Sequence, residues 1–470
     1  MPPDSVPPAL WARLEATDQT HLLRLFDQLD AGGRQRLIDQ LESIDFQQVA
    51  RLQSLARQEP PRPAGLSAAE LASARTPRSP RLRESDQSSA TPDEAAAAGA
   101  AMLAAGEVGA VIVAGGQATR LRCEGPKGVF PIGPVSQASL FELLLGRLKA
   151  VAARSGHRLP LAIMTSSATD AQTREFLGQH AYFGLDPAEL LFFRQGDLPA
   201  ITIDGGNLML DAADHVAMAP DGHGGLLQAL SAAGGLEWFA RFGCRDIVTF
   251  QVDNPLAMPL DEEFLGHHRL GESEFTTQVV EKTDPAERVG VVAEIDGTTR
   301  LIEYSDLPEE LAEAREADGR LRLRAGSIAI HAFTREFLER AADSDGLPLH
   351  LARKAVPHLD EAGRLVTPRQ PNAVKFERFI FDLMPLARRV LPVEVDAAEG
   401  FAPLKNPSGS ASDSPEHVRA AMVHLARRRC LEAGIDVAEG VSVELAPDTL
   451  TAEILRRRVA GGRIDTDRVV

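Results

Sequence analysis

A loop between residues 111 and 128 carries residue types that bind a polyphosphate. It reads Val111-Ile-Val-Ala-Gly-Gly-Gln-Ala-Thr-Arg-Leu121, and Pro126-Lys-Gly128 follows. An apolar run ends at paired glycines, and two cations, Arg120 and Lys127, come after them. Glycines let a backbone approach its ligand closely, and the N–H groups of such a loop bind anionic oxygens. We interpret the loop as a cradle for a nucleoside triphosphate; a tight turn with two surface cations is the alternative.

The loop matches neither of two common phosphate-binding motifs. A dinucleotide-binding fold requires G-x-G-x-x-G, whereas positions 115–120 read Gly-Gly-Gln-Ala-Thr-Arg. A P-loop requires Ser or Thr directly after its Gly-Lys pair, whereas Lys127 precedes Gly128 and neither residue type follows. The sequence therefore predicts triphosphate binding without a Walker lysine.

Two other segments have the composition of ligand-binding turns. Met218-Ala-Pro-Asp-Gly-His-Gly-Gly225 has three glycines in its last four residues, so its backbone can lie against a flat base. His223 within it could face a phosphate or a sugar, with a bystander histidine as the alternative. Asp253 follows an apolar strand, where open parallel sheets bind ligands, and a carboxylate suits Mg²⁺. We expect Asp253 to bind the metal; a turn-forming aspartate is the alternative.

Aromatic residues and one lysine near the end of the chain complete the set of candidates. Phe379 and Phe381 alternate with charged residues, in a chain with only 5% aromatic residues. Phe401-Ala-Pro-Leu-Lys-Asn406 places Lys405 in a rigid turn. Core phenylalanines and a solvated lysine are the alternatives for these residues.

The elements that must position these residues alternate between strand and helix. The expected strands are 108–114, 161–165, 190–194 and 247–252, and the expected helices are 93–105, 139–152, 170–179 and 224–233. This alternation predicts an α/β fold with a mostly parallel sheet and helices on both faces. Between 275 and 332 the apolar period becomes two, which predicts an antiparallel subregion beside the main sheet.

The length of 470 residues exceeds what one core usually supports, and three regions are expected. Residues 1–95 would form an N-terminal helical region followed by a Pro/Ser-rich linker. Residues 96–388 would form the catalytic domain, and 389–470 a small C-terminal domain containing short strands and a helix at 415–433.

Composition excludes several classes of protein. A formal net charge of −17 argues against a nucleic-acid partner. Three cysteines without a CxxC pair argue against a disulfide scaffold or a cysteine zinc site. The sequence shows neither a signal peptide nor a run of about 18 apolar residues, so we expect a cytoplasmic protein without membrane contact. The sequence does not indicate an oligomeric state.

Taken together and in order, short strings from residue 108 to about 430 resemble the UDP-N-acetylglucosamine pyrophosphorylases of eukaryotic type, within the UDP-sugar pyrophosphorylase family. The matching strings are Ala114-Gly-Gly-Gln-Ala-Thr-Arg-Leu121, Pro126-Lys-Gly128, Tyr182-Phe-Gly-Leu185, Gln195-Gly-Asp-Leu-Pro-Ala200, Met218-Ala-Pro-Asp-Gly222, Val252-Asp-Asn254, Val280-Glu-Lys282, Val289-Gly-Val-Val292, Glu303-Tyr-Ser305 and Pro403-Leu-Lys-Asn406.

The resemblance implies uridylyl transfer, in which UTP and a sugar 1-phosphate give a UDP-sugar and pyrophosphate. It also implies a Rossmann-like nucleotidyltransferase core with a mixed sheet and a small C-terminal β-containing domain. The residues implied to bind the nucleotide are Ala114, Gly115, Gly116, Gln117 and Lys127 at the phosphates and Gln195 and Gly222 at the uracil. Those implied to line the sugar site are His223, Gly290, Glu303, Ser327, Phe379 and Phe381. The resemblance also implies that Arg120, Lys127 and Lys405 are the catalytic cations and that Asp253 binds Mg²⁺ or Mn²⁺.

Three departures from the family pattern leave the sugar open. Ala118 stands where the loop usually has glycine, and His223 and Ser327 each replace an asparagine of the sugar site. N-acetylglucosamine 1-phosphate is the marginal favourite, and a UDP-glucose or broad UDP-sugar pyrophosphorylase is the alternative. A nucleotide-sugar-using glycosyltransferase and a non-catalytic UDP-sugar sensor are the other possibilities. The triphosphate cradle argues against the glycosyltransferase, and the intact cations argue against the sensor.

Overall fold

The computed structural model describes residues 5–57, 66–84, 90–343 and 346–470. The chain folds into two compact units, each made of segments that are not contiguous in sequence. The first unit consists of Met1–Gly65, Gln195–Gly225 and Leu347–Ile380, and the second of Leu66–Arg194, Leu226–Gly346 and Phe381–Val470. The domain boundaries expected from the sequence, at 95 and 388, stay a prediction.

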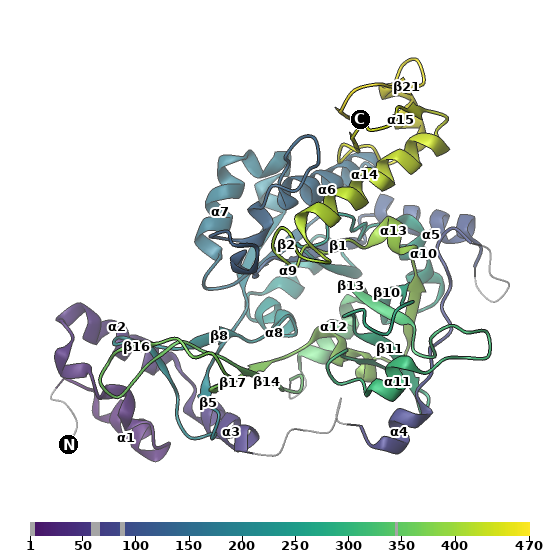
Figure 1. The fold of residues 1–470 in the computed structure, drawn as a ribbon. Coiled ribbons are helices and arrows are strands. Elements are labelled where there is room, and N and C mark those ends of the chain that lie inside the picture. Colours follow the sequence, from purple (N-terminus) through teal and green to yellow (C-terminus); the bar gives the residue numbers. More distant parts are fainter. Residues whose placement is uncertain (1–4, 58–65, 85–89, 344–345) are drawn as a thin grey trace. The chain divides into compact units, whose positions relative to one another are not determined.

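One mixed nine-stranded sheet forms the centre of the second unit (Figure 1). Four of its strands run parallel to one another in one block, namely β9 (Asp246–Gln251), β1 (Val108–Val113), β2 (Leu161–Thr165) and β3 (Leu190–Arg194). The others are β12 (Thr298–Ile302), β11 (Val291–Ile295), β13 (Ala325–Thr334), β10 (Phe275–Glu281) and β18 (Val390–Glu394). Because β13 pairs antiparallel with β9, the strands with period two extend the main sheet and do not form a separate subregion. The expected α/β fold with a mixed sheet is confirmed.

Helices connect these strands, as the alternating pattern predicts. They are α4 (Ala68–Ser73), α5 (Pro92–Ala104), α6 (Leu140–Ser155), α7 (Asp170–Gln179), α8 (Gly225–Ala232), α9 (Gly235–Arg241), α10 (Glu262–Leu270), α11 (Glu309–Glu313), α12 (Arg335–Ala342), α13 (Ala397–Gly400) and α14 (Pro415–Glu432). The helix α6 shows how local sequence sets these boundaries. The Ser139 side chain accepts a hydrogen bond from the Glu142 N–H at its start, and Gly156 adopts a left-handed conformation at its end. Between them, leucines and Phe141 pack into the core against the sheet.

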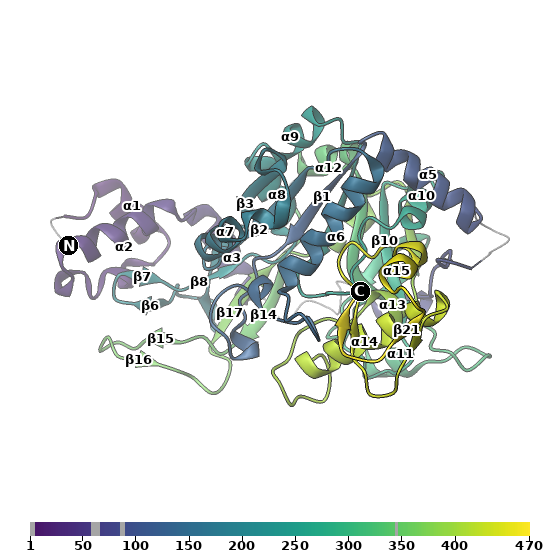
Figure 2. The same ribbon diagram turned by 90° about the horizontal axis from the view of Figure 1, so that it is seen from above.

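Two glycines let α5 and α10 approach each other closely, and the two helices lie side by side in both views (Figures 1 and 2). A Cβ on Gly99 would lie 1.8 Å from the Glu262 carbonyl oxygen of α10. A Cβ on Gly266 would lie 1.7 Å from the Ala95 carbonyl oxygen of α5. Both distances are far below a van der Waals contact, so neither position accepts a side chain without moving a helix.

The first unit joins the N-terminal helices to strands from two later segments. Its helices are α1 (Pro8–Ala16), α2 (Ala31–Ser43) and α3 (Phe46–Arg57), and its strands are β4 (Asp197–Pro199), β5 (Ile201–Thr202), β6 (Leu210–Ala212), β7 (His215–Val216), β8 (Met218–Pro220), β14 (His350–Lys354), β15 (His358–Leu359), β16 (Leu365–Val366) and β17 (Ala373–Glu377). One apolar core contains residues from all three segments, and β7 lies against α2 (Figure 2).

Two glutamines, one in α2 and one in the segment before it, bind the N-terminal region to the strands through paired hydrogen bonds. The Gln19 amide accepts from the Leu208 N–H at 2.7 Å and donates to the Gly206 carbonyl at 3.0 Å. The Gln40 amide accepts from the Val216 N–H at 2.7 Å and donates to its carbonyl at 3.1 Å. Each glutamine thus satisfies backbone groups that a neighbouring strand would otherwise bind.

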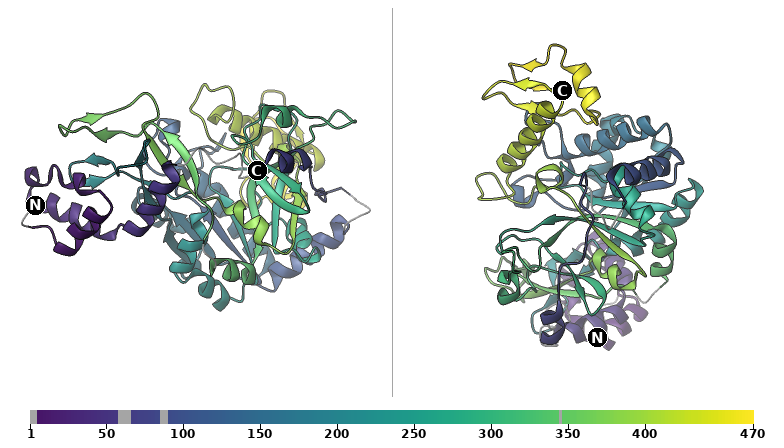
Figure 3. Two further views of the ribbon diagram at one scale, coloured as in Figure 1. Left: turned by 90° about the horizontal axis from the view of Figure 1, so that it is seen from below. Right: turned by 90° about the vertical axis from the view of Figure 1, so that its right-hand side faces the viewer.

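The last forty residues form a small module at the end of α14 (Figure 3, right). It contains β19 (Asp436–Val437), β20 (Val443–Glu444), α15 (Ala452–Arg458), β21 (Arg463–Ile464) and β22 (Arg468–Val469) around its own apolar core. The buried Glu444 carboxylate accepts hydrogen bonds from the Val135 and Ser136 N–H groups, both at 2.8 Å, and from the Ser136 hydroxyl at 2.6 Å. This carboxylate therefore satisfies the turn that leads from Lys127 into α6.

The close packing of α5 on α10 predicts a strong effect of one methyl group. Gly266→Ala should lower the midpoint of urea unfolding, at a cost of about 1–3 kcal/mol, because the added Cβ overlaps the Ala95 carbonyl. Gly178→Ala in α7 is the matched control, since the nearest atom to its Cβ is the Tyr182 hydroxyl oxygen at 4.0 Å. The control should be neutral or stabilising by up to about 1 kcal/mol. A Gly266→Ala midpoint equal to that of the parent would contradict the packing described.

Candidate functional site

An ion pair joins two neighbouring parallel strands of the second unit at their carboxyl ends. The Lys127 Nζ lies 3.2 Å from Oδ2 of Asp253, and 17% and 13% of the two side chains are exposed. Asp253 follows β9 and the glycine loop follows β1, and the Val252 N–H bonds the Val113 carbonyl between them. This edge is where open α/β sheets bind ligands.

The glycine loop is closed by backbone hydrogen bonds. The Lys127 N–H donates to the Gly116 carbonyl at 2.9 Å, and the Ser166 hydroxyl donates to the Gly115 carbonyl at 2.8 Å. Gly116 and Gln117 are exposed at its tip, whereas Ala114 and Gly115 are buried. The loop therefore fixes the backbone of Lys127 and leaves its outermost residues open to a ligand.

Alanine at position 118 fits this loop without strain. Its φ is −82°, a conformation open to any residue, and its methyl group is buried. Arg120 lies two residues further on in a short 3₁₀ turn, Thr119–Leu121, and its side chain is exposed. Within the described part of the chain the Arg120 guanidinium makes no hydrogen bond or ion pair, so it is available to an anion.

The segment that carries Lys405 is anchored directly to Asp253 and its neighbour. The Leu404 N–H donates to the Asp253 carbonyl at 2.8 Å. The Asn254 amide donates to the Gly400 carbonyl at 2.7 Å and accepts from the Ala402 N–H at 3.1 Å. The Lys405 ammonium itself lies 5.8 Å from the centre of the Phe401 ring. The structure thus brings together Lys127, Asp253 and the backbone next to Lys405, which the sequence placed far apart.

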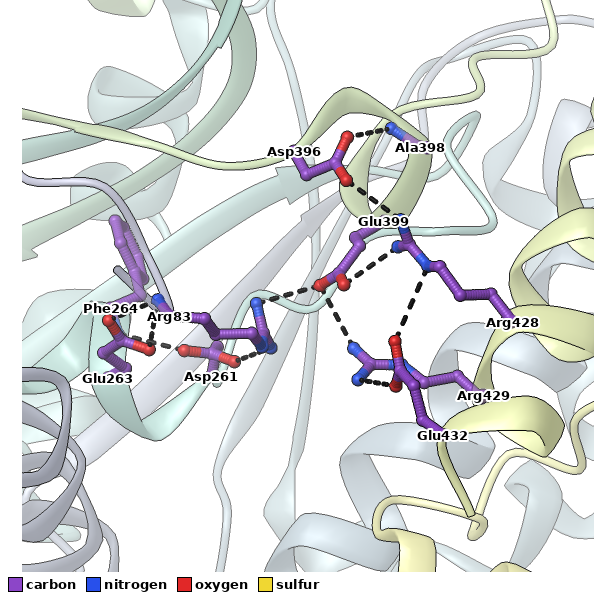
Figure 4. A network of polar contacts seen from close by, with 10 residues as sticks. All are labelled: Arg83, Asp261, Glu263, Phe264, Asp396, Ala398, Glu399, Arg428, Arg429 and Glu432. Carbon is purple, nitrogen blue, oxygen red and sulfur yellow. Dashed lines mark hydrogen bonds and ion pairs between the residues drawn. The ribbon is translucent and has the colours of Figure 1, made fainter. Parts of the chain in front are cut away.

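The Glu399 carboxylate, which is surrounded by arginines, anchors the helix that precedes this segment (Figure 4). Glu399 in α13 accepts from Arg83 at 3.0 Å, Arg428 at 2.8 Å and Arg429 at 3.1 Å. Arg428 also binds Asp396 at 2.9 Å. Because α13 directly precedes Phe401, these pairs set where the Lys405 segment begins. No local pattern indicated this network, because Arg83 lies more than 300 residues before Glu399 in the chain.

The candidate uracil-binding residues are held together in the first unit. The Asp221 N–H donates to the Gly196 carbonyl at 2.9 Å, which fixes the residue next to the buried Gln195. Gly222 has a φ of +86°, and a Cβ on it would lie 2.4 Å from the Arg378 carbonyl oxygen, so the position requires glycine.

Asp221 and Arg378 are residues that the sequence analysis missed. The Arg378 N–H donates to the Asp221 carbonyl at 2.7 Å, and the two side chains form an ion pair at 3.4 Å. Burial raises the pKa of the Asp221 carboxyl to about 6, against the opposing charge of Arg378. The sequence signal for Asp221 was its position inside the Met218–Gly222 motif. It was missed because an aspartate between proline and glycine is usually interpreted as a turn former.

His223 is a neutral imidazole packed among aromatic rings. Its Nδ1 accepts a hydrogen bond from the Ile380 N–H at 3.2 Å, so the proton of the neutral ring is on Nε2. The ring stacks on Phe379 with centroids 5.3 Å apart, and His350 packs on the same phenylalanine at 4.5 Å. Burial, with His350 nearby, lowers the pKa of His223 to about 4. The ring therefore stays uncharged at neutral pH, and its role as a sugar-binding residue stays a prediction.

The other candidate sugar-binding residues lie in the second unit. The Ser327 N–H donates to the Gly290 carbonyl at 2.9 Å. A Cβ on Gly290 would lie 3.3 Å from Oε1 of Glu303, so this carboxylate lies against the glycine. Phe381 is buried in the same unit. The roles of all these side chains stay predictions.

Asp253 is the protein group suited to a divalent metal. Among the described residues there is no group of three or more His, Cys, Asp or Glu side chains that could hold an ion. Oδ1 of Asp253 makes no hydrogen bond within the described chain, so one hard oxygen is available beside Lys127. A Mg²⁺ ion bound there would take its other ligands from phosphate oxygens and water, which is how this ion usually binds.

The sequence of this chain is similar to those of known proteins. Residues 75–414 match the model of the UTP–glucose-1-phosphate uridylyltransferase family. The chain is 37% identical over 434 residues to UDP-N-acetylhexosamine pyrophosphorylase-like protein 1 of Homo sapiens, covering 90% of this chain and 85% of the relative. It is 34% identical over 350 residues to UDP-N-acetylglucosamine pyrophosphorylase of Saccharomyces cerevisiae, covering 73% of each chain.

A solved structure shares both sequence and fold. The crystal structure of a putative UDP-N-acetylglucosamine pyrophosphorylase from Entamoeba histolytica superposes with a TM-score of 0.75 at 30% identity, over 80% of this chain and 96% of that one. None of the helices in the described residues is long and apolar enough to span a membrane. On the match of residues 75–414 and on these similarities, the chain belongs to the UTP–glucose-1-phosphate uridylyltransferase family.

Proposed function

We propose that this protein transfers the uridylyl group of UTP to a sugar 1-phosphate, with N-acetylglucosamine 1-phosphate as the favoured acceptor and Mg²⁺ as the metal. The reaction class follows from the family, and the relatives named for UDP-N-acetylhexosamine or UDP-N-acetylglucosamine support the sugar. The observation that carries the proposal is the Lys127–Asp253 pair at the strand ends, beside an open glycine loop. A cytoplasmic location is part of the proposal.

The chemistry requires no covalent protein nucleophile. A phosphate oxygen of the sugar 1-phosphate attacks the α-phosphorus of UTP, and the bond to pyrophosphate breaks in line. Positioning and charge stabilisation supply the rate. We assign Lys127, Arg120 and Lys405 to the phosphate oxygens, where negative charge develops on the leaving pyrophosphate. A metal on Asp253 would add positive charge to the same oxygens.

The nucleobase is recognised by an amide. The side chain of Gln195 offers one donor and one acceptor group, which complement the edge of uracil. Gly222 lets backbone groups approach the base, since its position has no room for a side chain. This pairing favours UTP over purine nucleotides.

A broad UDP-sugar pyrophosphorylase is the second candidate, and one observation favours it. The uncharged ring of His223 carries a single N–H donor, on Nε2, at the position where the N-acetylglucosamine enzymes that this chain resembles have an asparagine amide with both a donor and an acceptor. A single donor pairs with a 2-hydroxyl as well as with an acetamido carbonyl, so we propose a relaxed acceptor site.

Removal of the Lys127 ammonium should abolish most turnover. Lys127→Ala is expected to lower kcat on the order of 10²-fold or more, because the group stabilises charge that develops in the transition state. Pyrophosphate release from UTP and N-acetylglucosamine 1-phosphate measures this effect. Lys354→Ala removes an exposed lysine of β14 and should leave kcat unchanged. A Lys127→Ala enzyme within about threefold of the parent would refute the assignment.

Metal dependence is the second test. Turnover should vanish in excess chelator and return with Mg²⁺ or Mn²⁺. Asp253→Asn should abolish Mn²⁺ binding in the presence of UTP, followed by the electron paramagnetic resonance signal of free Mn²⁺, because it removes the carboxylate ligand. Asp39→Asn on the exposed face of α2 is the control. Full activity in chelator, or unchanged Mn²⁺ binding by Asp253→Asn, would exclude the metal role.

The choice of sugar is tested at His223. His223→Asn should raise the ratio of kcat/KM for N-acetylglucosamine 1-phosphate over glucose 1-phosphate, since an asparagine amide can both donate to and accept from an acetamido group. The exposed His215, paired with Asp211, gives the control His215→Asn. An unchanged ratio for His223→Asn would show that this ring does not contact the sugar.

A further inference from the structure

A cavity of about 410 Å³ lies in the second unit, away from the residues assigned above. Its walls come from α5, α6, α10, β10, α13, α14 and the segment 445–455, and they combine apolar side chains with charged ones. Representative wall residues are Leu82, Val151, Leu256, Leu260, Leu450 and Leu455. This volume is within the range of cavities that bind small organic ligands.

One arginine of the wall forms no ion pair with a carboxylate of that wall, and the Glu444 carboxylate acts on its pKa only from beyond 4 Å. Arg83, Arg154 and Arg429 are each paired with acidic residues of the same wall. Arg147 of α6 is different, since in the described chain no carboxylate lies within 4 Å of its guanidinium. Its Nη1 donates to the Pro255 carbonyl and, at 3.3 Å, to the Ala257 carbonyl. Its Nε and Nη2 make no hydrogen bond there, and burial lowers the pKa of Arg147 to about 10.

A buried amide supplies the second polar group. Gln278 of β10 is 2% exposed and lines the cavity, and its side chain makes no hydrogen bond within the described residues. Thr276, two residues earlier, binds His268 of α10 at 2.7 Å, so side chains at this register point toward the helices that surround the cavity. An unpartnered buried amide is rare in folded proteins and calls for a bonding partner.

The charge of the wall restricts the ligand. The lining contains four arginines and five carboxylates, namely Arg83, Arg147, Arg154, Arg429, Asp261, Glu262, Glu263, Glu399 and Glu432. A polyanion would therefore meet net repulsion, whereas one carboxylate can bind the free edge of the Arg147 guanidinium. The apolar walls favour an apolar body of aromatic or branched aliphatic type.

The same arginine connects the cavity to the loop that follows Asp253. The Arg147 guanidinium binds the carbonyls of Pro255 and Ala257, which are two and four residues after Asp253. Gly400, whose carbonyl binds Asn254, also lines the cavity. We propose that this cavity binds an organic monocarboxylate with an apolar body and that the bound ligand alters turnover by fixing Arg147 and the loop that follows Asp253. The effect on turnover rests on the proposed uridylyl transfer, whereas binding does not.

The test uses dansylglycine, an aromatic carboxylate whose fluorescence reports an apolar environment, and dansylamide, which lacks the carboxylate. We expect one equivalent of dansylglycine to bind the full chain about tenfold or more tightly than dansylamide, because only the former can pair with Arg147. Excess UTP should not displace it. Saturating dansylglycine should change kcat at least about twofold without competing with UTP, since its site is separate from the nucleotide.

Three variants locate the site. Ala96→Trp fills the cavity from α5 and should abolish binding, whereas Ala97→Trp on the exposed face of the same helix should not. Arg147→Gln keeps an N–H donor for the loop carbonyls, removes the charge, and should make the two dansyl compounds bind equally. The proposed site would be overturned if the parent bound dansylglycine and dansylamide equally. It would also be overturned if dansylglycine still bound to Ala96→Trp, or if UTP displaced it. Binding without a change in kcat would overturn the coupling, and binding by a chain that releases no pyrophosphate would refute uridylyl transfer alone.

Discussion

The contacts of Asp253 are the constraint on which the second unit's site depends. Its carboxylate holds the Lys127 ammonium, and its backbone carbonyl holds the segment that contains Lys405. One residue just after β9 therefore holds one cation directly and the backbone beside a second, and the two come from distant parts of the chain. Such a pair is partly buried, so removing either partner leaves an uncompensated charge, which is far more costly than losing an exposed pair.

The surroundings of this pair are rigid for reasons that are mostly backbone geometry. The glycine loop is closed by its own hydrogen bonds, Asn254 bonds the backbone on both sides of Phe401, and three arginines fix α13 through Glu399. In the first unit, the stacking of His223 on Phe379 and its hydrogen bond to Ile380 play the same part. Preorganised groups of this kind lose little freedom when substrate binds, and this favours catalysis by positioning.

Local patterns predicted much of this structure. The strand and helix spans of the core, the position of Asp253 after β9 and the turn formed by the glycine loop could be read from apolar periodicity and from glycine positions. The missed features depend on pairing between distant segments. Nothing local shows that Gln19 binds Leu208, that Glu399 gathers three arginines, or that Arg378 pairs with Asp221. The division into two discontinuous units was missed for the same reason, because strands from 195–225 and 347–380 complete the core of the N-terminal helices.

The Glu444 contact has a consequence for the order in which the molecule can be completed. The turn at Val135–Ser136 receives its carboxylate from a residue 308 positions later in the chain. That residue is in β20, which pairs with β22 at residues 468–469. During synthesis on the ribosome, domains generally fold from the N-terminus onward. The N–H groups of the turn after the glycine loop therefore stay bonded to water until the final strands have been synthesised and Glu444 can bind them.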